Sequence, residues 1–335
     1  DAMTGLADLG QIMVRMDRIG GPGVFLGFGH TEGRLDNSRY EFGFGAPAFG
    51  IDAHFASILA EPDDGGRLNA YRTYLDEVLM VACLPAGDAG QIARTAVEIE
   101  RTLYSGVLSP IERRDPRLTY NPTTLDELQS LIPEVDLSEL LETAGYPPDI
   151  ENVVLFSPRY LPVLSEVLRT RPIEDIKDYL KLRMILKFAP AMSTAFQEPN
   201  LGLSAVLLGS AVVPLRAETA AQLVAEHLAH PLGQIYVDAH LTENARTAAE
   251  DMFARVKAVF ARRIPTRDWL SEETRAEAAA KLADLSATMG GPDTWIDYSA
   301  VEIGADPVAN LMSIAAFEHD RYMAKYGGPV SREAF

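Results

Sequence analysis

The feature that most constrains the fold of this 335-residue chain is the helical spacing of its apolar residues. In one run the apolar positions recur at i, i+4, i+8, i+11 and i+12: Ala248, Met252, Val256, Val259 and Phe260. Residues three and four apart share one face of an α-helix, so this spacing predicts an amphipathic helix with one apolar face. The same period dominates much of the chain.

Helix-start signals support further helices. Thr124 and Glu127 have the spacing of a capping box, and Ser271 precedes Glu272 and Glu273 in the way that a helix N-cap precedes acidic first-turn residues. The second of these helices is expected to run through Lys281 and to stop at the Gly-Gly-Pro at 290–292. Other helices are expected over residues 68–84, 89–108, 138–144, 161–169, 173–189, 217–229 and 307–326.

Extended structure is scarce in the sequence. Residues 152–156 form the best strand candidate, because prolines bound an apolar run there. The glycine- and phenylalanine-rich stretch 20–50 is expected to be a loop with buried aromatic anchors, and the apolar run 203–215 a buried core segment. Cys83, the single cysteine, is expected to pack as a small hydrophobic residue within an apolar helix. The predicted fold class is therefore mainly α, a large multi-helix lobe.

Composition excludes some classes of function. The formal net charge is −18, and no large cluster of lysine and arginine offsets it, so a nucleic-acid partner is not expected. No uninterrupted apolar stretch reaches the roughly 20 residues that span a bilayer. With one cysteine, the fold cannot contain an intrachain disulfide.

Catalytic motifs are also missing. The sequence contains no H-E-x-x-H and no G-x-S-x-G. The nearest metal-like group joins His227 and His230 to Asp238 and His240, but Pro231 interrupts the helix and no glutamate stands in the position of a general base. We assign no catalytic, cofactor-binding or metal-ligating residue to this chain.

A series of short motifs nevertheless follows a recognisable order. They are GFGAP at 43–47, RDP at 114–116, TYN at 119–121, TLDEL at 124–128, LIP at 131–133, SPRYL at 157–161, IKDYLK at 176–181, LGQIYV at 232–237, WLSEETRAEAAAKL at 269–282 and GGPDTWIDY at 290–298. In this order they resemble the N-terminal helical domain of the neprilysin-type (M13) zinc metallopeptidases. The paired cysteines of the animal ectodomains are absent, so the chain looks like a bacterial member.

The resemblance implies a role as well as a fold. In the family, the helical lobe faces a zinc-bearing catalytic lobe across a cavity that admits peptides. The zinc-binding helix follows the counterpart of Phe335. Residues 1–335 are thus expected to form one N-terminal helical domain, with possible sub-lobes 1–110 and 111–335. Zinc and catalysis are expected in a complementary half, either a separate chain in a heterodimer or a removed C-terminal portion, with a peptide substrate in the shared cavity. Location in the bacterial cytoplasm is favoured over export.

Two alternatives stay open at this point. One is a non-catalytic peptide-binding or scaffold protein that has kept the helical lobe. The other is a metal-binding protein that uses His227 and His230.

Overall fold

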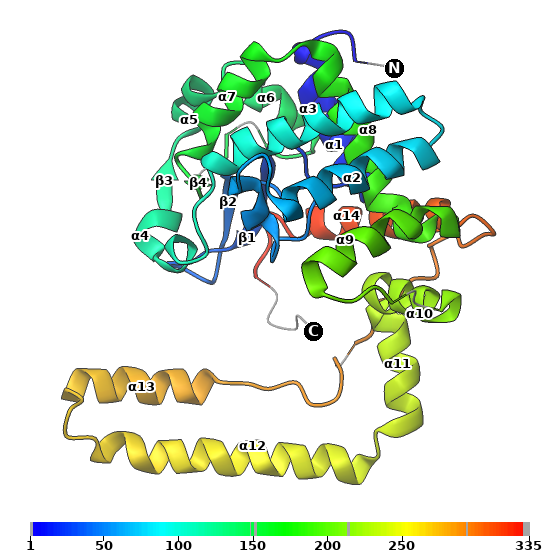
Figure 1. The fold of residues 1–335 in the computed structure, drawn as a ribbon. Coiled ribbons are helices and arrows are strands. Elements are labelled where there is room, and N and C mark those ends of the chain that lie inside the picture. The colour runs from blue at the N-terminus through cyan, green and yellow to red at the C-terminus, as the bar shows by residue number, and fades with distance from the viewer. Residues whose placement is uncertain (1–2, 148, 151–152, 213–214, 293, 331–335) are drawn as a thin grey trace. The chain divides into compact units, whose positions relative to one another are not determined.

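The computed structural model describes residues 3–147, 149–150, 153–212, 215–292 and 294–330. These residues are mainly helical, as the sequence predicts (Figure 1). The helices are α1 Leu9–Arg18, α2 Gly66–Val81, α3 Ala86–Ser105, α4 Pro116–Thr119, α5 Leu125–Leu131, α6 Leu137–Thr143, α7 Tyr160–Thr170, α8 Ile173–Phe188, α9 Glu198–Leu208, α10 Arg216–His227, α11 Ala229–His240, α12 Glu243–Arg263, α13 Glu272–Asp284 and α14 Pro307–Met323.

The chain divides into two compact units. Unit 1 comprises residues 1–221 and 301–330, and unit 2 comprises residues 222–300 with 331–335. Unit 1 therefore takes in α14, which follows unit 2 along the chain. Each unit is described by itself below.

A small four-stranded sheet lies in unit 1. Its strands are β1 Gly27–Glu32, β2 Tyr40–Gly45, β3 Asn121–Thr123 and β4 Val153–Leu155, in the order β1-β2-β4-β3. β1 and β2 form an antiparallel hairpin, and β4 runs parallel to β2 and antiparallel to β3. Phe42 and Phe44 of β2 are completely buried, so the centre of the sheet belongs to the core.

Helices pack around this sheet to complete the core of unit 1. α3 contacts α2, α7 and α8, while α1 contacts α6 and α14. α3 and α7 bury one apolar face each, at 3–4-residue spacing. Residues of the first turn of α14 are held by Asp306, whose side chain accepts hydrogen bonds from the backbone N–H groups of Val308 and Ala309.

A polar cluster is buried inside this apolar core. Glu100 of α3 accepts hydrogen bonds from the hydroxyl of Tyr71 at 2.8 Å, the hydroxyl of Tyr179 at 3.0 Å and the backbone N–H of Gly50 at 2.6 Å. Arg183 of α8 donates to Tyr179 and to the carbonyl of Ala48. The cluster ties α2, α3 and α8 to the loop after β2. Burial, and then the negative charge of Glu100, raise the pKa of Tyr71 and Tyr179.

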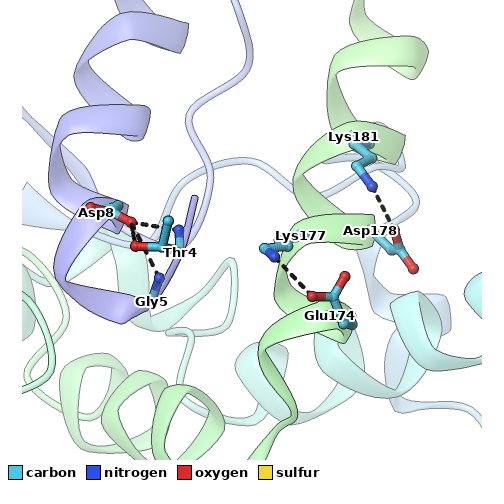
Figure 2. A network of polar contacts seen from close by, with 7 residues as sticks. All are labelled: Thr4, Gly5, Asp8, Glu174, Lys177, Asp178 and Lys181. Carbon is cyan, nitrogen blue, oxygen red and sulfur yellow. Dashed lines mark hydrogen bonds and ion pairs between the residues drawn. The ribbon is translucent and has the colours of Figure 1, made fainter. Parts of the chain in front are cut away.

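Local contacts support the helices at their ends and along their exposed faces. Figure 2 shows Asp8, whose carboxylate accepts hydrogen bonds from the backbone and hydroxyl of Thr4 and the backbone of Gly5 just before α1. It also shows Lys177 and Lys181 of α8, each paired with the acid three residues earlier. The Thr124–Glu127 capping box and the Ser271 N-cap are both present, as predicted.

The structure corrects several sequence-based expectations. Within residues 20–50, the expected loop contains the β1–β2 hairpin, although Phe25 is buried as expected. Glycines alternate with aromatic residues along both strands of the hairpin. The buried strand β4 pairs with the other edge of β2. The predicted strand at 152–156 is confirmed over β4, while Asn152 lies outside the described residues.

The apolar run 203–215 is not a buried segment in the part that the structure describes. Leu203 of α9 is buried, but Leu208, Val212 and Leu215 are exposed, because Gly209 ends the helix with a left-handed turn. Cys83 is also exposed. It lies just beyond the end of α2 with a positive φ of 66° rather than inside the helix. α13 ends at Asp284, before the predicted stop at 290–292.

Candidate functional site

The histidines do not assemble into a metal centre within the described residues. His227 ends α10 and His230 lies in the first turn of α11, where its ring packs edge-on against Trp295 at 5.9 Å. His240 ends α11 beside Tyr236. No three His, Cys, Asp or Glu side chains in the described part of the chain lie together as a possible set of metal ligands. These residues therefore do not fit a zinc ion, and the structure gives no support to the metal-binding alternative.

Unit 2 has almost no core of its own. Among its described residues, 222–292 and 294–300, only Gly291 is buried. The apolar stripe predicted on α12 is present but faces solvent: Met252 is 67% exposed and Phe260 55%. We call Met252, Val256, Val259 and Phe260 the α12 apolar face. Soluble proteins rarely leave a contiguous apolar surface of this kind uncovered unless it meets a partner.

Further apolar side chains of unit 2 are equally exposed. On α11 they are Ile235 and Tyr236, at 67% and 65%, and between α12 and α13 Trp269 is 76% exposed. Figure 1 shows α12 and α13 as the two arms of a helical hairpin. Lys257 of α12 donates to the carbonyls of Ala283 and Leu285 at the C-terminal end of α13, both at 2.8 Å. Contacts of this number and kind cannot replace a buried core.

Two of the motifs that carry the resemblance meet inside unit 2. Gly233 belongs to the LGQIYV motif at 232–237, and Gly291 and Trp295 belong to the GGPDTWIDY motif at 290–298. A methyl group added at Gly233 would lie 3.3 Å from the Trp295 ring, and one added at Gly291 only 2.9 Å from it. Gly291 also has a φ of 154°, which side-chain-bearing residues rarely adopt. The glycines thus allow the indole to lie directly against the backbone.

A histidine that sequence reasoning passed over has the most unusual surroundings. His30 of β1 is buried, its Nδ1 lies 2.9 Å from the hydroxyl of Tyr146, and its ring stacks on Tyr322 of α14 at 3.9 Å. Nε2 is buried without a hydrogen-bond partner. Burial, and next the positive charge of Lys325, lower the pKa of His30 to about 4. The alternation of β1 is the only local signal that could have indicated its burial.

This cluster fastens α14 to the sheet. The hydroxyl of Tyr322 donates to the carbonyl of His30 at 2.6 Å, and Tyr326 packs against both His30 and Tyr146. Gly29 makes room for the hydroxyl, since an added Cβ would lie 2.6 Å from it. His30 thus connects distant parts of unit 1 through Tyr146, Tyr322 and Tyr326, and we call this set of contacts the His30 joint.

The arrangement matches one family of proteins. The model of peptidase family M13 matches residues 2–292. The chain belongs to peptidase family M13. The predicted recognition is thereby confirmed, and so is the fold, since the solved chains that resemble it include zinc metalloproteases of this family.

Individual M13 relatives agree with this assignment. Human endothelin-converting enzyme-like 1 is 28% identical over 250 residues, which cover 73% of this chain and 32% of that protein. Human neprilysin is 24% identical over 220 residues, covering 62% and 29%. The neutral endopeptidase of Lactobacillus helveticus is 26% identical over 216 residues, covering 64% and 33%.

Solved structures of zinc metalloproteases resemble this chain over almost its whole length. The zinc metalloprotease ZMP1 of Mycobacterium tuberculosis in its open state superposes with a TM-score of 0.86 at 25% identity, covering 99% of this chain and 52% of that one. This M13 chain thus spans about half of that solved chain, and its matched region covers about a third of the length of the curated relatives. None of the helices described is long and apolar enough to cross a membrane.

Proposed function

We propose that this chain is the substrate-enclosing helical half of an M13 zinc metallo-endopeptidase or oligopeptidase, and that a zinc-bearing half completes it. The observation that carries this proposal is the uncovered apolar surface of unit 2. α11, α12 and α13 contain no buried residue, while Met252, Phe260 and Trp269 are more than half exposed.

Coverage supports the same conclusion. The chain aligns with only about half of the zinc metalloprotease ZMP1 of Mycobacterium tuberculosis. A half-molecule cut from such a protein would leave exposed the surface that the other half normally covers. Obligate interfaces resemble a domain core divided in two, and the α12 apolar face has that character.

The chemical contribution of this chain follows from what its described residues lack and contain. They hold no set of metal ligands, so water activation by zinc belongs to the other half. The helices of this chain enclose the substrate cavity. They exclude bulk water, limit the size of the peptides that enter, and hold a substrate near the zinc-bearing surface. We place no catalytic residue in this chain. The two halves form either one polypeptide or a heterodimer, and the same contacts serve both cases.

The test is reconstitution. A quenched fluorogenic peptide is incubated with this chain, with the zinc-bearing M13 half from the same source, and with both, each with and without a chelator. Hydrolysis that needs both halves, and that the chelator abolishes, is expected. Chelator-sensitive hydrolysis by this chain alone would overturn the proposal. Binding of peptide without any association between the halves would favour the non-catalytic scaffold instead.

A matched pair of variants locates the contact. Phe260→Glu places a charge on the α12 apolar face and is expected to abolish both association and hydrolysis. Phe260→Leu keeps the face apolar and is expected to retain both. Equal behaviour of the two variants would show that this face is not the contact.

A further inference from the structure

A surface groove in unit 1 lies along the outer side of α3. It is a hollow of about 810 Å³ between α3, the short 3-10 helix Ala56–Ala60 with the loop after it, Arg72 of α2, and Arg171 beyond α7. All of these elements belong to unit 1, so the groove is complete within that unit. Its size suits an extended peptide segment of a few residues.

Positive charge dominates the groove although the chain as a whole is strongly acidic. Four arginines line it, Arg72, Arg94, Arg101 and Arg171, against two carboxylates, Asp63 and Glu98. The net charge of the chain is −18, so a local surplus of positive charge stands out from its surroundings.

Two of the four arginines are already neutralised. Arg101 pairs with Asp63 and also donates to the carbonyls of Leu59 and Glu61, and Arg171 pairs with Glu98 at 2.9 Å. These contacts hold the walls of the groove together. Because they satisfy both carboxylates of the lining, they leave the other two guanidinium groups as its surplus charge.

Among the described residues, neither Arg72 nor Arg94 has a carboxylate within the 4 Å of an ion pair. Asp76 of α2 is near Arg94 without pairing with it: a Cβ added at Gly90 would lie 3.5 Å from Arg94 Nη1 and 3.7 Å from Asp76 Oδ1. Arg72 donates from Nη1 to the Asn69 amide oxygen at 2.8 Å, and its Nε is buried with no hydrogen-bond partner. Arg94 donates to the Gln91 amide oxygen at 2.9 Å. Each guanidinium group carries five N–H donors, so both arginines keep donors beyond these bonds, and a carboxylate is the preferred partner of a guanidinium group.

The rest of the lining is suited to a peptide. Leu59 and Val97 are buried beneath the groove, Tyr104 gives an aromatic side, and Thr102 and Ser105 provide hydroxyl groups. A nucleic acid needs an extended basic face, whereas only two unpaired cations are present here, beside two carboxylates. Apolar and aromatic walls with a few convergent polar groups are typical of sites for organic ligands.

We infer that this groove binds a short acidic peptide segment, with Arg72 and Arg94 receiving its carboxylates and the half-buried Tyr104 contacting its side chains. The site lies outside the proposed function, since it requires neither zinc nor the second half. It would select acidic segments before or apart from any cleavage.

The test uses the chain as it is. A fluorescein-labelled peptide Glu-Asp-Tyr-Glu-Asp-Leu and its twin Gln-Asn-Tyr-Gln-Asn-Leu are titrated with the chain, and fluorescence anisotropy measures their affinities at low and at physiological salt. Binding of the acidic peptide at least 10-fold tighter than of the amide twin is expected, with affinity falling as salt rises. Equal binding of the two peptides would overturn the inference.

Variants locate the site. Arg72→Gln with Arg94→Gln is expected to weaken binding of the acidic peptide at least 10-fold with an unchanged circular dichroism spectrum. Arg15→Gln with Arg113→Gln removes the same charge from exposed residues outside the groove lining and is expected to change affinity less than 2-fold. Equal losses of affinity in the two double variants would mean that the peptide is held only by non-specific electrostatic attraction, and would overturn the inference. So would complete displacement of the peptide by a hexanucleotide at equal concentration.

Discussion

The carboxylate of Glu100 lies 3.8 Å from the guanidinium group of Arg183, and both side chains are at least 96% buried. This pair forms the centre of the polar cluster that joins α2, α3 and α8 to the loop after β2. An ion pair in such a place is sensitive to the loss of one partner, because the remaining charge has no water to solvate it.

Replacement of Glu100 by Gln is therefore expected to destabilise unit 1 by about 3–5 kcal/mol, a typical cost of breaking a buried pair. Urea unfolding followed by circular dichroism measures it. Glu166→Gln, which breaks the exposed Glu166–Arg169 pair, is the matched control and should cost less than about 1 kcal/mol. If both variants unfold at the same urea concentration, the buried pair does not have the role assigned to it.

The His30 joint predicts a specific dependence of stability on pH. The folded protein holds the pKa of His30 at about 4, below its ordinary value of 6.5. The unfolded chain therefore binds the proton more readily, so the contribution of His30 is complete above pH 6.5 and is lost as the pH falls to about 4.

The expected loss across this window is about 1–3 kcal/mol, since one pKa unit corresponds to about 1.4 kcal/mol. The urea midpoint is measured from pH 7.5 to pH 4 for the wild-type chain and for His30→Gln. Carboxylates titrate in both proteins, so the difference between the two pH profiles reports on His30 alone. The variant should show a flatter profile. Parallel profiles would mean that His30 stays neutral in both states or titrates normally in the fold.

Gly29→Ala should loosen the attachment of α14. The added Cβ would lie 2.6 Å from the Tyr322 hydroxyl, and the φ of 154° at this position disfavours any side chain. A loss of about 1–3 kcal/mol is expected from the urea midpoint. Gly66→Ala in the first turn of α2, where nothing lies within 4 Å of an added Cβ, should be neutral or slightly stabilising.

Trp269 reports on the contact that the proposed function requires. It is 76% exposed in this chain, so its fluorescence should resemble that of tryptophan in water. In a Trp295→Phe background, addition of the zinc-bearing half is expected to shift the emission maximum of Trp269 to shorter wavelength and to reduce binding of a hydrophobic dye. An unchanged spectrum in a mixture that hydrolyses peptide would place the contact elsewhere.

Helices were predictable because their signals are local. The stripe from Ala248 to Phe260 and the capping box at Thr124 depend on residues within a few turns of each other, and both are present as helix and cap. The β1–β2 hairpin was not predicted, because glycines, which are depleted in strands, recur through both runs, at Gly27 and Gly29 of β1 and at Gly43 and Gly45 of β2. Phe42 pairs with Val153, far along the chain, and no local window contains that information.

The candidate surfaces were less accessible to sequence reasoning. Periodicity identified the α12 apolar face but not its exposure, because a period shows which residues share a face and not what covers it. Arg72, Arg94 and Arg171 are well separated in sequence, so their shared groove appears only in the fold. The predicted burial of Cys83 and of the run 203–215 was wrong for a similar reason, since apolar neighbours in sequence do not ensure that a residue is buried.

The bond from Tyr322 to the carbonyl of His30 closes a separation of 292 residues. A ribosome that adds roughly 5–20 residues each second would need about 15–60 seconds to travel from one to the other. Throughout that interval the β1–β2 hairpin lacks its contact with α14, and residues 222–300 of unit 2 are synthesised in the meantime. Within residues 1–335, β1 is thus among the first elements to be synthesised, yet its contacts with α14 are among the last to form.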